Sequence, residues 1–178
     1  MRLDDGTLLN ENVACLLYLA DAKPDAGLAP APRTPGRYQL INALAFVATE
    51  IHQALGVLFA ASPSAEARRQ LVLCAACRVR CCLLTRVVQI TAFLKERAKK
   101  KLQTLNDVML RDDGFLVPGA LFTAADAYCY VTLSWVEGLG LGPLSAWPRA
   151  AAYYERVKAL PNVQAAHARM AENPKSVL

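Results

Sequence analysis

The residues with the clearest capacity for chemistry in this 178-residue sequence are a histidine in a long apolar stretch and a Glu-Asn pair at the expected start of a short helix. His52 carries an imidazole that can give or accept a proton near neutral pH. Glu11 and Asn12 stand where free helical N–H groups favour a bound carboxylate, and Glu11 can also pair with an ammonium group. The alternatives are structural: a helical histidine packed in the core, and Asn10 or Asn12 capping the helix.

Four of the six cysteines crowd into nine positions and raise the question of a metal site. Four thiolates can bind zinc, but the step between the second and third cysteine is shorter than the usual separation of two zinc knuckles, and no histidine is near. Three of the four also fall on one helical face, which favours a buried helix. We therefore predict no metal site at Cys74, Cys77, Cys81 and Cys82.

Composition favours one globular domain, with 54% apolar residues and a formal net charge of +5. The excess charge is local, because residues 71–92 hold three arginines and no Asp, Glu or Lys, and the rest of the chain has 17 basic against 15 acidic residues. No basic face with base-reading partners is evident, so we predict no nucleic-acid partner. The acidic start (MRLDD) and the lack of an apolar run of about 18 residues predict a cytoplasmic protein without membrane contact.

The hydrophobic pattern is mainly helical. Residues 3–8 (LDDGTL) predict two short strands around an Asp-Gly turn, and residues 29–36 (APAPRTPG) predict a linker. Apolar residues recur at steps of three and four elsewhere, and Pro148 and Pro161 mark first helical turns. The helices are predicted at residues 10–22, 40–58, 93–109, 124–136, 147–159 and 161–171.

Two motifs indicate more together than either does alone. Thr123 and Asp126 predict a capping box in which each side chain binds a backbone N–H of the other, with Phe122 packing on Ala127. Residues 4–11 (DDGTLLNE) predict a hairpin that delivers an acidic residue to a helix start. The hairpin followed about 112 residues later by the capping box resembles the motifs of the glutathione S-transferases. The class it resembles most closely is the bacterial beta type. Residues 18–21 (YLAD), 48–52 (ATEIH) and 144–148 (LSAWP) extend the resemblance.

The resemblance implies a mainly α fold: a helical bundle like the C-terminal domain of these enzymes, preceded by the hairpin and helix that remain of a thioredoxin-like α/β domain. We expect residues 1–24 to be that remnant, 25–36 the linker and 37–178 the helical domain. It further implies glutathione as co-substrate, held at Glu11 and Asn12, with His52 facing the glutathione sulfur as a catalytic residue. The implied partners are glutathione and an apolar electrophile, and a homodimer stays open.

The sequence departs from the family in two places. The first βαβ unit has no counterpart, and neither has the Cys, Ser or Tyr that acts on the glutathione sulfur. Residues 71–92 are 16 apolar residues of 22, unlike their flanks, and have the character of an insertion. Our hypothesis is that residues 71–92 are translated from a sequence that is normally removed from the transcript. A transcript lacking these codons would support it, and their presence in every transcript would count against it.

These observations predict a glutathione S-transferase-like protein whose family reaction conjugates glutathione to electrophiles, with weak or no turnover by this chain alone. The alternative is a noncatalytic helical module for protein interaction. The aromatic residues, Tyr128 among them, are expected mainly in the core, although Trp135 is also suited to the border of an electrophile pocket.

Overall fold

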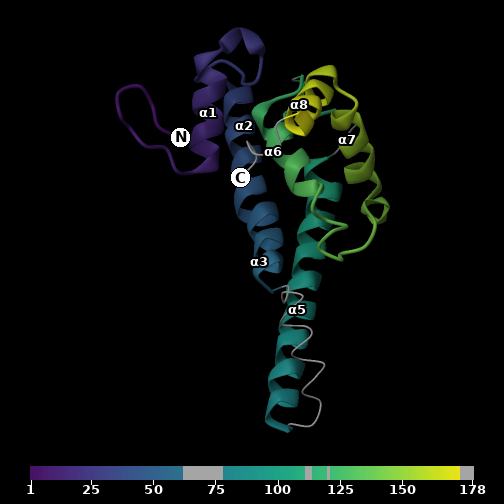
Figure 1. Ribbon diagram of the computed structural model, residues 1–178. Coiled ribbons are helices and arrows are strands. Elements are labelled where there is room, and N and C mark those ends of the chain that lie inside the picture. Colours follow the sequence, from purple (N-terminus) through teal and green to yellow (C-terminus); the bar gives the residue numbers. More distant parts are fainter. Residues whose placement is uncertain (62–77, 111–113, 120, 173–178) are drawn as a thin grey trace.

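The computed structural model describes residues 1–61, 78–110, 114–119 and 121–172, and the side chains of residues 61, 78–85 and 87 are not included. The described part is almost entirely helical (Figure 1). Its elements, in chain order, are α1 (Asn12–Ala22), the 3-10 turn η1 (Pro24–Ala26), α2 (Pro35–Phe46), the π-helical turn η2 (Val47–His52), α3 (Gln53–Ala61), α5 (Arg78–Thr104), the π-helical turn η3 (Leu105–Met109), α6 (Ala124–Leu133), the 3-10 turn η4 (Leu144–Ala146), α7 (Pro148–Lys158) and α8 (Pro161–Glu172).

The first ten residues turn back on themselves but form no strand among the described residues. Arg2 and Leu8 make one isolated antiparallel bridge, and Gly6 holds the turn at a φ of +87°, which glycine adopts without a steric penalty. The predicted turn is therefore present, whereas the two predicted strands are not. Two short segments without a neighbouring strand bury too little surface to form a stable sheet. The thioredoxin-like remnant at residues 1–24 accordingly stays a prediction.

The longest apolar pattern becomes one continuous helix made of α2, η2 and α3. Its core stripe is at most 1% exposed and consists of Leu40, Leu44, Val47, Ile51, Leu55 and Leu58. By length and composition alone the segment Pro35–Ala60 also passes a test for a membrane span. Its apolar stripe faces the protein core, and 33% of the apolar window is buried.

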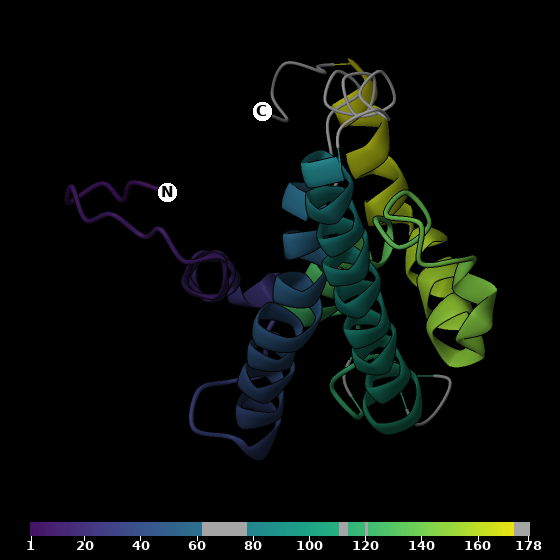
Figure 2. The same ribbon diagram turned by 90° about the horizontal axis from the view of Figure 1, so that it is seen from below.

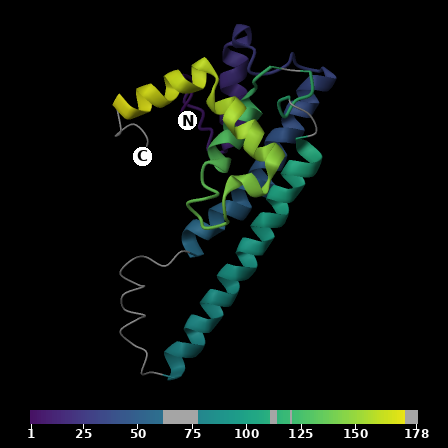
Figure 3. The same cartoon turned by 90° about the vertical axis from the view of Figure 1, so that its right-hand side faces the viewer.

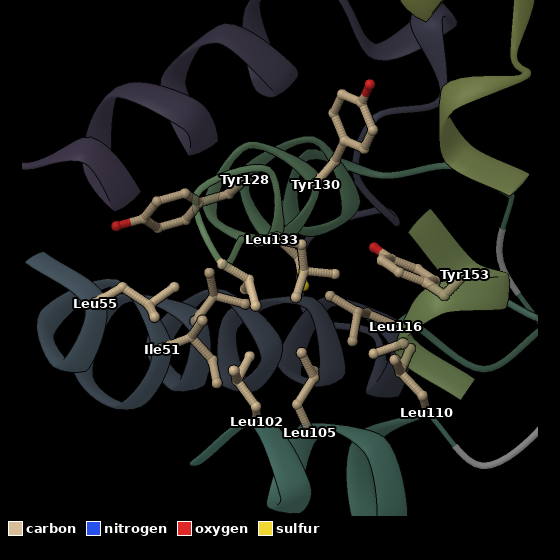
Figure 4. Packing of buried hydrophobic residues seen from close by; sticks show 14 of the residues in the cluster. Ile51, Leu55, Leu102, Leu105, Leu110, Leu116, Tyr128, Tyr130, Leu133 and Tyr153 are labelled. Carbon is tan, nitrogen blue, oxygen red and sulfur yellow. The ribbon is translucent and has the colours of Figure 1, made fainter. Parts of the chain in front are cut away.

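The core lies between this helix and helices α5, α6 and α7. Helix α5 runs alongside α3, while α6 packs between α2 and α7 (Figures 1 and 2). Figure 4 shows Ile51 of η2, Leu102 of α5, Leu105 of η3 and Leu133 of α6 meeting in this cluster. Helix α8 follows α7 and packs against it. The arrangement is a helical bundle, which confirms the predicted fold class.

Helix α5 begins earlier than predicted. The pattern indicated a helix from residue 93, but α5 is continuous from Arg78 and extends past the end of α3 (Figures 1 and 3). Val88, Ile90 and Phe93 are each more than half exposed, so this part of α5 lies outside the core. Cys74 and Cys77 lie outside the described residues, as do the side chains of the other two clustered cysteines. The interpretation of 71–92 as an insertion stays a prediction.

An ion pair ties α1 to α2. The guanidinium of Arg37 donates to both carboxylate oxygens of Asp21, at 2.7 and 2.6 Å, and also to the Pro30 carbonyl oxygen at 3.4 Å. The Arg37 side chain is 11% exposed and the Asp21 side chain 48%. Hydrogen bonding from Arg37 lowers the pKa of Asp21 below its ordinary value of 3.8. Thr34 caps α2 by accepting the Arg37 backbone N–H at 3.2 Å, so the linker and both helices meet here.

We predict that Asp21→Asn lowers the free energy of unfolding by about 1 kcal/mol or less near pH 7, because the pair is half exposed. The folded-state pKa of Asp21 is lowered, so its stabilising effect is complete above 3.8 and is lost as pH falls through the lowered value. Urea unfolding of both proteins at neutral and acidic pH measures this difference. A difference between the two proteins that grows with acidification would contradict the assignment.

Candidate functional site

A buried carboxylate fixes the start of α6, the helix on which the site depends. Thr123 and Asp126 form a capping box, and the carboxylate of Asp126 accepts the Thr123 N–H at 2.8 Å and the Thr123 hydroxyl at 2.7 Å. Its other oxygen accepts the Leu116 N–H at 2.9 Å and the Tyr153 hydroxyl at 2.8 Å. Asp126 is fully buried. Four donors thus compensate for its loss of hydration and join the loop before α6 to α7.

Tyr153 keeps its proton for this bond. Burial is the main cause that raises the pKa of its hydroxyl well above 10.0, and the neighbouring Cys129 and Asp126 add to the effect. Phe122, predicted to pack on Ala127, makes an edge-on contact with Phe115, the two ring centroids being 6.2 Å apart.

His52 is the last residue of the π-helical turn and points to α6. π-helical turns inside α-helices are rare and often coincide with functional sites. The Nδ1 atom of His52 forms a hydrogen bond with the hydroxyl of Tyr128. The imidazole also meets Trp135 edge-on, with ring centroids 5.2 Å apart, and Trp135 in turn meets Phe59 at 5.4 Å. His52 is therefore half-buried among aromatic rings.

Tyr128 connects His52 to the start of α1. Tyr128 is 7% exposed and lies at the edge of the apolar cluster, with its hydroxyl directed away from the leucines (Figure 4). Burial raises the pKa of this phenol above 10.0, a hydrogen bond with the Asn12 side chain lowers it, and the charge of Glu11 raises it further. The structure thus brings His52 and Tyr128 into hydrogen-bond contact and places Asn12 and Glu11 near enough to the Tyr128 hydroxyl to shift its pKa.

The N-terminal end of α1 has no side-chain cap, as the binding of a carboxylate at its free N–H groups requires. Glu11 occupies the N-cap position with extended backbone, and no side-chain hydrogen bond caps the helix. Glu11 and Asn12 are both exposed. The capping alternative is therefore not what these side chains do, because no side-chain hydrogen bond caps α1.

Sequence reasoning missed Tyr128 as part of this site. A tyrosine in an apolar helical stripe is typical of a core residue, and no signal in the sequence shows that its hydroxyl meets a histidine 76 positions away. Trp135 was placed beside a possible electrophile pocket, and it lies against His52. Among the described residues, no group of three or more His, Cys, Asp or Glu is arranged to hold a metal ion.

The clearest cavity lies away from these residues. About 870 Å³ of space opens between the first turns of α2, the end of η3 and the loop before α6, beside Tyr38, Asn42 and Phe115. A smaller pocket of about 90 Å³ is lined by Thr49 and Glu50 of η2 and by residues of α3 and α5. Neither includes His52, Tyr128 or Glu11.

Residues 66–156 match the family "Glutathione S-transferase, C-terminal domain". The chain is 32% identical over 162 residues to glutathione S-transferase GstA of Escherichia coli O157:H7, covering 91% of this chain and 68% of that protein. It is 30% identical over 168 residues to glutathione S-transferase GST-4.5 of Xanthomonas campestris, covering 91% and 70%. The chain belongs to the glutathione S-transferase family.

Solved structures agree with this assignment. A sphingomonad glutathione S-transferase in complex with glutathione is 32% identical, has a TM-score of 0.69 and matches over 93% of this chain and 70% of that chain. A bacterial beta class enzyme from Sphingomonas chungbukensis is 34% identical, with the same TM-score and coverage. The predicted resemblance to beta-type glutathione S-transferases is confirmed at the level of family and fold.

We predict that Asp126→Ala lowers the free energy of unfolding by about 3 kcal/mol or more. The substitution leaves buried donors of Leu116, Thr123 and Tyr153 without their acceptor, at about 1–3 kcal/mol each. Urea unfolding measures the loss, and Asp25→Ala, at an exposed position in η1, serves as the control with no measurable change expected. A loss below about 1 kcal/mol for Asp126→Ala, the size of a single helix cap, would contradict the role given to this carboxylate.

Proposed function

We propose that this chain binds glutathione at the start of α1 and presents the thiol to His52 for conjugation with an apolar electrophile. The observation that supports this most is the hydrogen bond between His52 and Tyr128, with Asn12 beside the same hydroxyl, because it brings together the two places that the resemblance assigned to one ligand. The N–H groups of the first turn of α1 suit the γ-glutamyl carboxylate, and Glu11 suits its ammonium group.

The electrophile would lie beside the aromatic residues next to His52. Trp135 packs on the imidazole, and Phe59 is 53% exposed on the other side of Trp135. Flat apolar surface next to the sulfur favours an apolar or aromatic electrophile. The proposed class of electrophile is inferred from this aromatic surface.

Cellular location and assembly are part of the same proposal. Cys15 and Cys129 are free thiols, as expected in the reducing cytoplasm. A homodimer would use the exposed apolar side chains of the long helix, which include Tyr38, Ile41 and Val57.

The proposed function predicts that the chain binds glutathione. Titration calorimetry of the purified chain with glutathione should show saturable binding, and Glu11→Gln should weaken it about tenfold by removing the partner of the ammonium group. Glu172→Gln, on the exposed end of α8, is the matched control and should bind as the parent chain does. Equal affinity of Glu11→Gln and the parent chain would remove Glu11 from the site.

The proposed function also predicts the rate at which the chain conjugates glutathione. Conjugation of glutathione to 1-chloro-2,4-dinitrobenzene by the chain alone should be weak, because a single half-buried imidazole is the group that this site offers to the sulfur. His52→Ala should lower the remaining glutathione-dependent rate. Robust turnover that His52→Ala abolishes would show that the chain is a competent enzyme by itself and would overturn the expectation of weak activity.

A noncatalytic helical interaction module is the second candidate. It is favoured by the part of α5 beyond α3, where Val88, Ile90 and Phe93 are 63%, 58% and 67% exposed. The same calorimetric titration separates the two candidates. An interaction module requires no glutathione, so the absence of saturable binding in a folded chain would favour it.

A further inference from the structure

The cavity of about 870 Å³ beside the first turns of α2 is separate from the residues proposed to bind glutathione. Three elements border it. Helix α2 contributes Tyr38, Gln39 and Asn42, η3 contributes Met109, and the loop before α6 contributes Phe115. Pockets for small organic molecules usually have volumes of about 300–1,000 Å³. The cavity is therefore large enough to hold one such molecule.

Hydrogen bonds within the protein hold both walls of this cavity. In the loop before α6, the Leu116 N–H donates to the Asp126 carboxylate at 2.9 Å. The Gly114 carbonyl oxygen accepts from the Arg156 guanidinium at 2.6 Å. On the opposite side, the Thr34 cap fixes the first turn of α2. Because these bonds form without a ligand, the cavity is preformed, which lowers the entropic cost of binding.

The lining of the cavity combines apolar surface with two amide groups. Tyr38 and Phe115 provide aromatic rings, and the amides of Gln39 and Asn42 lie about one turn apart on α2. Neither amide has a hydrogen-bond partner within the described part of the chain. Each amide offers one acceptor oxygen and two N–H donors.

The described lining residues include no Asp, Glu, Lys, Arg or His. A charged ligand would lose hydration in this cavity without gaining an opposite charge, which is costly. An uncharged ligand avoids that cost. Aromatic rings suit the apolar part of the lining, and one N–H or O–H group suits the amide oxygens.

We propose that this cavity is a second binding site, which takes an uncharged aromatic ligand with an N–H or O–H group. The rings of the ligand pack on Tyr38 and Phe115, and its polar group bonds the amides of Gln39 and Asn42. Glutathione is excluded by its charges, so the site is independent of the proposed function. A second copy of the chain is the competing occupant, because Tyr38 is also among the side chains offered for a homodimer.

Two fluorescent probes with the same ring skeleton test the class of ligand. N-phenyl-1-naphthylamine is uncharged and has one N–H group, whereas 1-anilinonaphthalene-8-sulfonate adds a negative charge. The uncharged probe should bind the purified chain saturably at one site, and the sulfonate should bind about tenfold more weakly or less. The absence of saturable binding, or a sulfonate that binds as tightly, would overturn the proposal.

Substitutions at Asn42 test the location of the probe. Asn42 is exposed, so Asn42→Phe fills the cavity without disturbing the core and should weaken binding by about tenfold or more. Asn42→Ala keeps the space but removes one hydrogen bond, and should weaken binding about threefold. Asn162→Phe, at an exposed position of α8, is the matched control and should bind as the parent chain does. Unchanged affinity in a folded Asn42→Phe variant would overturn the proposal.

Three further observations separate this cavity from other sites. In ¹H–¹⁵N spectra, the side-chain amide signals of Gln39 and Asn42 should shift when the uncharged probe binds, and signals that stay in place would contradict the proposal. Glutathione should leave the affinity for the probe unchanged, and competition would place the probe at the other site. An affinity that falls as the chain concentration rises would show that a second copy occupies the cavity instead. If glutathione does not bind, the proposed function fails while the probe titrations still decide this site.

Discussion

The buried carboxylate of Asp126 is the interaction on which the rest of the structure depends. A charge without hydration is costly, and here four donors from the preceding loop, the helix start and α7 compensate for that cost. The same bonds fix where α6 begins and how it is rotated. Because Tyr128 lies only two positions further on, its side chain direction follows from the cap.

The candidate site is assembled from three segments that are far apart in the sequence. Tyr128 comes from α6, His52 from the π-helical turn of the long helix, and Asn12 from the start of α1. The bidentate ion pair of Arg37 and Asp21 holds α1 against that long helix. The site therefore depends on tertiary packing of all three segments, and a change in any one of these contacts would alter the geometry around His52.

Much of the fold follows from local sequence. Proline at first helical turns, helical apolar spacing and the Thr123 motif predicted α1, α6, α7 and α8 with small errors at their ends, because each signal acts within one or two turns. The two short strands were not formed, since pairing requires neighbours that local sequence does not specify. The continuity of α5 back to Arg78 was also not predicted, because the composition of residues 71–92 differs from that of their flanks and indicated a separate inserted segment.

The candidate site was predicted less completely for a related reason. Helix starts and histidines are visible in a sequence, so Glu11, Asn12 and His52 were named. The tyrosine that joins them was not, since its apolar neighbours are typical of core and its polar contact spans 76 positions. The π-helical turn that ends at His52 likewise has no simple sequence signal.

Native-state amide hydrogen exchange at Leu116 and Thr123, the two backbone donors to Asp126, tests the central role of this carboxylate most directly. If Asp126 holds α6 and the preceding loop as one unit, both amides exchange only through global unfolding, with the same opening free energy as the buried turns of α6 around Leu133. Exchange of these two amides through a separate local opening of much lower free energy, while α6 stays protected, would contradict the account.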